Sequence, residues 1–120
     1  MTIIDSRQGD AAETVETDLC IVGGGAAGIT LTLDLMHSGL TIAIIESGGE
    51  SFDPAVQRLY AGRNVGLDNY PLSQSRVRMW GGSTTRWAAQ CRMMERLDFQ
   101  RRDWIPDSGW PFDRDTLLPF

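Results

Sequence analysis

The chain has 120 residues, of which 42% are hydrophobic and 22% are charged, and its formal net charge at pH 7 is −5. This length predicts one compact unit and excludes two complete catalytic domains. The 11 basic residues, all arginines, form no basic run and are outnumbered by 16 acidic residues. The composition therefore argues against a nucleic-acid partner.

Targeting and redox signals are absent from the sequence. The first ten residues contain no basic segment leading into an apolar core, and no apolar run approaches the roughly 20 residues of a membrane helix. We therefore expect a soluble, cytoplasmic protein without a transmembrane segment. Two cysteines, Cys20 and Cys91, are too few for a disulfide scaffold, and no metal site is predicted. Cys20 lies in an apolar run, so we expect its thiol to be buried and unreactive.

Residues 1–16 are polar and acidic and are predicted to form a flexible leader. The apolar run 19–22 then predicts a strand that is buried on both faces. Apolar residues recur at helical spacing over 26–40, where Gly39 stands at the expected helix C′ position. The β-branched run 41–45 predicts a second strand. Together these elements predict a βαβ unit with a parallel sheet.

The second half of the chain has a weaker pattern. Residues 47–75 lack regular periodicity apart from a short helical stretch over 56–61, and a connection of this length usually serves function. Residues 109–112 predict a turn, and Asp113 is expected to cap a helix that begins at Arg114.

A glycine-rich turn joins the first predicted strand to the helix. Gly23, Gly25 and Gly28 match the G-x-G-x-x-G pattern of dinucleotide-binding turns, in the strand-turn-helix context that the pattern requires. Gly23 permits the tight turn, Gly25 lets a pyrophosphate approach the backbone, and Gly28 lets helix and strand pack closely. Ala26 and Ala27 would present helix N-terminal amides and a positive dipole end to the phosphates.

An acidic residue ends the second predicted strand. Glu46 follows Gly23 by 23 positions, near the spacing at which a carboxylate accepts hydrogen bonds from the adenosine ribose. A carboxylate there repels a 2′-phosphate and so disfavours NADP. The turn and this carboxylate leave both NAD and FAD open.

A second glycine pair favours FAD. Gly81 and Gly82 are followed by Ser83 and Thr84, whose hydroxyls can donate hydrogen bonds, and close approach of their backbone suits a long dinucleotide. An ordinary glycine turn is the alternative for this pair. The predicted cofactor-binding residues are Gly23, Gly25, Ala26, Ala27, Gly28, Glu46, Ser47, Gly81, Gly82, Ser83 and Thr84.

Two sets of segments resemble known flavoproteins. Residues 18–28 with 46–48 look like the N-terminus of FAD-dependent oxidoreductases in general. Residues 80–87 with 91–92, 98–99 and 101–112 more specifically resemble the glucose-methanol-choline (GMC) oxidoreductases, in the branch with pyranose oxidases and bacterial sugar and alcohol dehydrogenases. The resemblance implies an α/β, Rossmann-like FAD-binding unit over 17–120, incomplete because it is the N-terminal fragment of a larger FAD/NAD(P)-binding fold. It also implies oxidation of an alcohol or sugar CH–OH group by hydride transfer to FAD, with an electron acceptor that the sequence does not identify.

The sequence departs from that family at specific positions. Arg86 stands where pyranose oxidases carry the histidine that attaches the flavin, so non-covalent FAD is expected, and Thr85 replaces a common asparagine. Arg86 could approach a phosphate or the flavin, or be solvated. The family's catalytic base lies near its C-terminus, so no catalytic residue is expected in this chain, and His37 is read as a surface or helix-capping residue. We expect the isolated chain to be marginally folded and inactive.

Other interpretations remain open at this point. One is another FAD- or NAD-dependent oxidoreductase, although the absence of a Cys-x-x-Cys pair weakens a disulfide-reductase-like variant. Another is a non-catalytic dinucleotide-binding module or a truncated inactive product. The tryptophans are expected to form a cluster that packs the cofactor loop, with sugar stacking as the alternative; they are Trp80, Trp87, Trp104 and Trp110.

Overall fold

The computed structural model describes residues 2–8, 14–88 and 90–120. It divides the chain into two units, Met1–Ala89 and Gln90–Phe120. The predicted leader is thus described only in part, as irregular backbone and a short turn. Among the helices that the structure describes, none has both the length and the apolar character needed to cross a bilayer.

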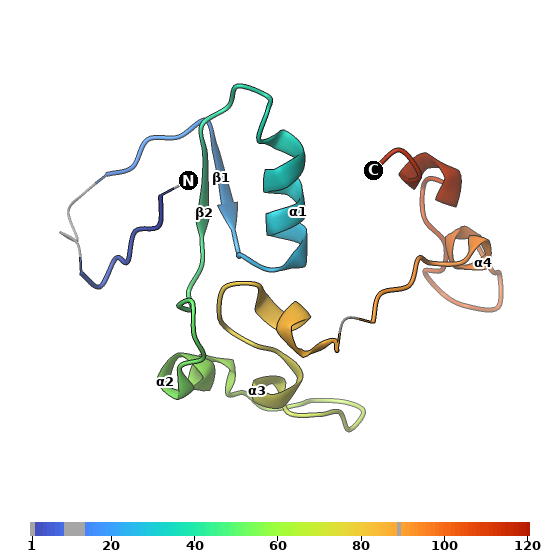
Figure 1. Ribbon diagram of the computed structural model, residues 1–120. Helices are drawn as coiled ribbons and strands as arrows, with labels where there is room; N and C mark the ends of the chain where they lie inside the picture. Colours follow the sequence, from blue (N-terminus) through green and yellow to red (C-terminus); the bar gives the residue numbers. More distant parts are fainter. Residues whose placement is uncertain (1, 9–13, 89) are drawn as a thin grey trace. The chain divides into compact units, whose positions relative to one another are not determined.

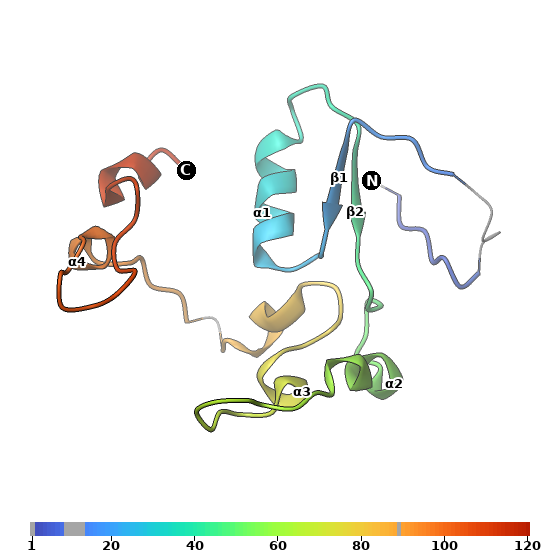
Figure 2. The same cartoon turned by 180° about the vertical axis from the view of Figure 1, so that it is seen from behind.

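The first unit contains strand β1 (Leu19–Val22), helix α1 (Ala26–Leu35) and strand β2 (Ile42–Ile45), in that order. The two strands pair in parallel, with Val22 opposite Ile45. Figures 1 and 2 show α1 running beside the strands, and the turn that joins β1 to α1 lies at the carboxyl end of β1. The predicted mixed α/β character and the parallel strand pair are confirmed.

Helix α1 is shorter than its periodicity predicts. It ends at Leu35, and the Ser38 N–H then donates to the Leu35 carbonyl at 2.9 Å in a tighter turn. Gly39 adopts φ +84° beyond this turn, so the prediction that it occupies the C′ position of the helix is wrong. His37 lies in the same turn and is exposed.

The prediction that β1 is buried on both faces is also wrong. Side chains alternate across a strand. Ile21, 9% exposed, lies near the backbone of α1 at Gly28, whereas Val22 is 83% exposed and Cys20 is exposed as well. The described residues supply one helix to cover the sheet, which buries Ile21 and leaves its neighbours open. The thiol of Cys20 is therefore not the buried group that its apolar context suggests.

Short helices fill the region after β2. Helix α2 (Pro54–Gln57) is capped by Asp53, whose carboxylate accepts from the Ala55 N–H at 2.7 Å. The helical path continues in the 3₁₀ helix η1 (Arg58–Tyr60), so the helical stretch predicted here is confirmed. Helix α3 (Leu72–Ser75) and the 3₁₀ helix η2 (Gly82–Arg86) follow; η2 contains the second glycine-serine-threonine segment.

The second unit is built on helix α4 (Arg96–Phe99) and the 3₁₀ helix η3 (Arg114–Leu117). Asp113 caps η3 by accepting from the Thr116 N–H at 3.0 Å, which confirms the predicted cap although the helix is 3₁₀. Phe99 is buried, and its ring centroid lies 6.1 Å from that of Phe112. The carbonyl of Phe99 also accepts from the Trp110 N–H at 3.1 Å, and this bond links two segments within the second unit.

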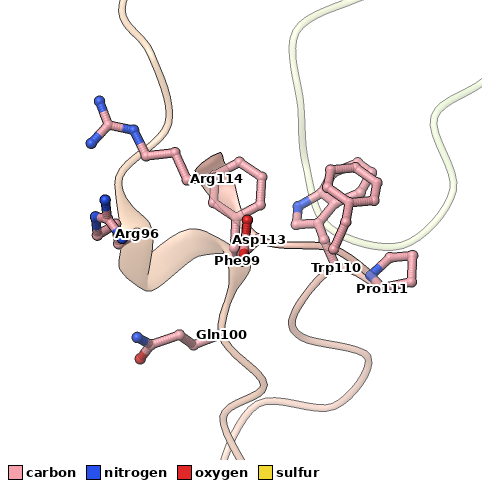
Figure 3. Close-up of a pocket in the computed structure, with 8 residues that line it drawn as sticks. Arg96, Phe99, Gln100, Trp110, Pro111, Asp113 and Arg114 are labelled. Atoms are coloured by element: carbon pink, nitrogen blue, oxygen red, sulfur yellow. The ribbon is translucent and has the colours of Figure 1, made fainter. Parts of the chain in front are cut away.

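An open pocket of about 480 Å³ lies within the second unit. Figure 3 shows Arg96 and Arg114 on one side of it and Trp110 and Pro111 on the other. No predicted cofactor-binding residue lines this pocket. Trp80 belongs to the first unit, whereas Trp104, 78% exposed, belongs to the second, so a cluster of all four tryptophans stays a prediction.

Candidate dinucleotide-binding site

The turn between β1 and α1 depends on glycine at two positions. Gly23 adopts φ +105°, a conformation that side chains strongly disfavour, and its N–H donates to the Ile45 carbonyl at 2.8 Å. A Cβ at Gly28 would overlap the Gly23 carbonyl oxygen and approach Cγ2 of Ile21 to 3.2 Å. The chain therefore turns sharply at Gly23, and the first turn of α1 packs directly on the end of β1.

The N-terminus of α1 is open toward the turn. The Ile29 N–H donates to the Gly25 carbonyl at 3.0 Å and begins the helical ladder, so the amides of Ala26, Ala27 and Gly28 precede it without helical acceptors. The first turn contains no acidic side chain. A Cβ at Gly25 would meet no described atom within 4 Å. This end of the helix thus combines amide donors, a positive dipole end and open space.

Glu46 lies directly after β2 and bridges two glycine segments. Its Oε2 accepts from the Gly24 N–H at 2.8 Å, and its Oε1 accepts from the Gly48 N–H at 2.8 Å. The Ser47 hydroxyl is a weaker third donor to Oε1, at 3.3 Å. A carboxylate has about four acceptor positions, so these three donors leave acceptor capacity for a further hydroxyl.

The second glycine pair lies against the first glycine turn. The Gly81 N–H donates to the Gly24 carbonyl at 2.8 Å, and a Cβ at Gly82 would come within 3.1 Å of the Gly25 Cα. The Trp80 ring also covers Gly24, where a Cβ would come within 2.9 Å of Cε3. Segments almost 60 positions apart in the chain thus form one backbone surface. The later segment is the yellow loop beneath α1 in Figure 1.

The segment after Glu46 completes this arrangement. A Cβ at Gly48 would overlap the carbonyl oxygen of Arg78, and the Trp80 N–H donates to the Gly49 carbonyl at 2.9 Å. We refer to residues 23–28, 46–49 and 78–84 together as the glycine junction. All of the predicted cofactor-binding residues lie in it.

The hydroxyl residues of the junction and the two residues that follow it have local partners. Ser83 Oγ accepts from the Val77 N–H at 3.2 Å, which leaves its own proton for another acceptor. The Thr84 hydroxyl donates to the Gly81 carbonyl, and the Thr85 hydroxyl donates to the Gly82 carbonyl at 2.9 Å. The Arg86 guanidinium lies 5.8 Å from the ring centroid of Phe52.

Three residues near the site were not predicted from the sequence: Arg78, Tyr60 and Gln57. Arg78 donates through Nη1 to Ser47 Oγ at 2.8 Å, and its guanidinium carbon lies 4.2 Å from the ring centroid of Tyr60. Gln57 is 8% exposed and its Oε1 accepts from the Arg78 N–H at 3.0 Å. Gln57 shows no sequence signal, because a glutamine in a short helix normally faces solvent. For Arg78, its position three residues before Gly81 was the sequence feature that could have indicated a place in the site.

The junction has the donors and the space that a dinucleotide requires. Its anion-binding end consists of the open Gly25 and the amides that begin α1, and its hydroxyl-binding end is the carboxylate of Glu46. These are the groups with which strand-turn-helix sites hold a pyrophosphate and an adenosine ribose. The residues present therefore fit the pyrophosphate and the adenosine ribose of a dinucleotide.

Comparison with known proteins gives one similarity. The chain is 38% identical over 56 residues to 6-methylpretetramide 4-monooxygenase of Streptomyces rimosus, a match that covers 40% of this chain and 13% of the relative. The chain thus spans a small part of the length of that relative. No family model and no solved structure matches the chain.

Proposed function

We propose that the glycine junction binds FAD without a covalent bond and that the chain serves an FAD-dependent oxidoreductase. The observation that carries this proposal is the open space at Gly25, bordered by the first amides of α1 and joined through Gly24 to the carboxylate of Glu46. A Gly-rich turn with an acceptor carboxylate at the end of the next strand suits both ends of an ADP group.

Each part of the junction then has one task. The Ala26 and Ala27 amides donate to the pyrophosphate, while Gly25 allows it to reach the backbone. Glu46 accepts from a ribose hydroxyl. The backbone of Gly81 and Gly82 lines the continuing cofactor, and the remaining Ser83 proton is a donor to it.

The redox half of the proposal rests on the resemblance to GMC oxidoreductases. Bound FAD supplies a hydride acceptor for the oxidation of an alcohol or sugar CH–OH group. The contribution of this chain is to bind and orient the cofactor through the amides that begin α1 and the carboxylate of Glu46. Arg86, in place of the histidine used for covalent attachment, supports a dissociable flavin.

A second candidate activity is oxygen insertion. The similarity to 6-methylpretetramide 4-monooxygenase favours it, since that relative is named as a monooxygenase. Both candidates use the same ADP-binding junction and differ in the chemistry of the bound cofactor and substrate.

Cofactor choice is tested by titrating the 120-residue chain with FAD, NAD and NADP and following flavin fluorescence and binding heat. We expect FAD to bind and ADP to displace it. A chain that binds NAD and rejects FAD would contradict the flavin proposal.

The two activities are separated in the protein purified from its natural source. Bleaching of its visible flavin absorbance by an alcohol or sugar without oxygen is expected from a CH–OH oxidoreductase. Bleaching that requires another reductant, followed by incorporation of one oxygen atom from O₂ into an organic substrate, would favour the monooxygenase instead.

A further inference from the structure

Arg78 is linked through Ser47 to Glu46, the carboxylate that is proposed to bind the ribose. Its Nη1 donates to Ser47 Oγ at 2.8 Å, and the Ser47 hydroxyl in turn donates to Glu46 Oε1 at 3.3 Å. The order of donors is fixed by chemistry, since a guanidinium has no acceptor and Glu46 has no proton to give when ionised. Ser47 therefore has to turn its proton toward Glu46.

Arg78 is held in place through both its side chain and its backbone. Its guanidinium stacks on Tyr60, with 4.2 Å from the central carbon to the ring centroid. Its backbone N–H donates to Oε1 of the buried Gln57 at 3.0 Å. The amide of Gln57 also donates to the Ser73 carbonyl at 2.6 Å and the Arg76 carbonyl at 2.7 Å, which fixes the segment leading to Arg78.

This arrangement is more costly than that of an ordinary surface arginine. Nε of Arg78 is buried without a hydrogen-bond partner among the described residues, and a buried donor in that state opposes folding. Arginine at this position also has its carbonyl pressed against Gly48, so its backbone is part of the junction. An arginine that only formed an exposed hydrogen bond to Ser47 would need neither the buried Nε nor the stacking on Tyr60.

We propose that Arg78 is a positioning residue for ribose recognition, acting through Ser47 on the carboxylate of Glu46. The guanidinium sets the Ser47 hydroxyl, and the hydroxyl and the two backbone donors of Gly24 and Gly48 hold Glu46 in one orientation. The remaining acceptor position of Glu46 then receives a hydroxyl of an adenosine ribose. This inference rests on the proposed function, because it assumes that ADP binds at the junction.

The test compares ADP with 2′,3′-dideoxy-ADP, which lacks both ribose hydroxyls, by isothermal titration with the 120-residue chain. We expect ADP to bind about tenfold more tightly than the dideoxy compound, the discrimination typical of a hydrogen bond to a charged group. In Arg78→Met we expect this ratio to fall to about twofold, with the affinity for the dideoxy compound unchanged.

Three further variants sharpen the result. Ser47→Ala should lower the ratio as Arg78→Met does, because it removes the middle of the chain of donors. Arg78→Lys, which keeps a cationic donor, should retain most of the discrimination. Arg63→Met, a change at an exposed arginine outside the junction, should leave the ratio as it is. Circular dichroism reports folding, and if Arg78→Met does not fold, Ser47→Ala decides.

The outcomes are distinguishable. A wild-type chain that binds neither compound at millimolar concentration would overturn the proposed function, and this inference with it. A wild-type chain that discriminates while folded Arg78→Met or Ser47→Ala discriminates equally well would overturn the role of Arg78 alone. Equal weakening of both compounds in Arg78→Met would also overturn it, since the arginine would then act on the phosphates or on the fold.

Discussion

The glycine junction and the sheet beside it are built in opposite ways. In the junction, three segments approach so closely that a Cβ at Gly28 or Gly48 would overlap a carbonyl oxygen. In the sheet, large apolar side chains such as Val22 and Ile45 stay exposed in the part of the chain that the structure describes. The candidate site is thus specified by backbone contacts, whereas the apolar surface near it contributes little burial.

The largest effect is expected from Gly28→Ala. The added methyl group would overlap the Gly23 carbonyl, and we expect a loss of about 3 kcal/mol in the free energy of unfolding, the upper range for overpacking. Urea denaturation followed by circular dichroism measures it. Gly62→Ala is the matched control, because its nearest neighbour would be 3.8 Å away. Equal stability of the two variants would contradict the close packing of α1 on the turn.

Ile21→Ala against Val22→Ala compares the two sides of β1 directly. Ile21 is buried near α1, so we expect its truncation to cost about 2 kcal/mol, the low end for a large-to-small core change. The exposed Val22 should cost less than about 0.5 kcal/mol. Urea midpoints of both variants provide the measurement, and a larger loss at Val22 would show that its face is covered.

Gly25→Ala should separate binding from stability. The new methyl group meets nothing in the described structure and the backbone has φ −89°, so we expect the fold to tolerate it. In the site it would occupy the space proposed for the pyrophosphate, and we expect about tenfold weaker ADP binding, or ~1.4 kcal/mol.

Isothermal titration and a urea curve on the same Gly25→Ala sample check both halves of this prediction. Gly62→Ala again serves as the control. Unchanged ADP affinity in the folded variant would place the phosphates elsewhere, and a loss of stability would show that the space at Gly25 is already filled.

The smallest effect concerns the opposite end of the strands. Asp18 accepts from the Thr41 hydroxyl at 2.6 Å and from the Thr41 N–H at 2.8 Å, and these bonds lower the pKa of Asp18 below its ordinary value of 3.8. A lowered pKa in the folded state adds stability above the unfolded pKa, and this stability is lost as the pH falls through the folded pKa.

We therefore expect Asp18→Asn to flatten the decline in stability below about pH 4, where an unfolded aspartate begins to protonate. Thermal unfolding at about pH 6, 4 and 3, across the titration range of aspartate, measures the difference in stability between the variant and the wild-type chain. Asp34→Asn, a change at an exposed residue of α1, is the control. A decline of the same slope in Asp18→Asn and the wild-type chain would rule out this role.

Much of the junction was predictable because its signals are local. A strand, a glycine turn, a helix and an acid after the next strand follow one another within 30 positions, and each restricts the backbone directly. That Gly81 and Gly82 line the same cofactor was inferred from chemistry, whereas their direct contact with Gly24 and Gly25 was not predicted.

Other features depended on tertiary context that a sequence does not display. The exposure of Cys20 and Val22 depends on what covers the sheet, and an apolar run carries no information on that. The early end of α1 follows from a single tighter turn at Ser38. Arg78 and Gln57 work through contacts between segments about 20 to 30 positions apart, so neither could be read from its neighbours.

The parallel register of the strands has one more consequence. Val22 pairs with Ile45, so the chain leaves both strands at the same level, and Gly24 meets Glu46 there. A slip of two residues keeps every side chain on its own face but moves Glu46 by about 7 Å along the sheet. The bond between Gly24 and Glu46 would then break. Ligand affinity at this turn is consequently a measure of strand alignment, and a binding titration detects a misaligned sheet that spectroscopy of secondary structure would count as native.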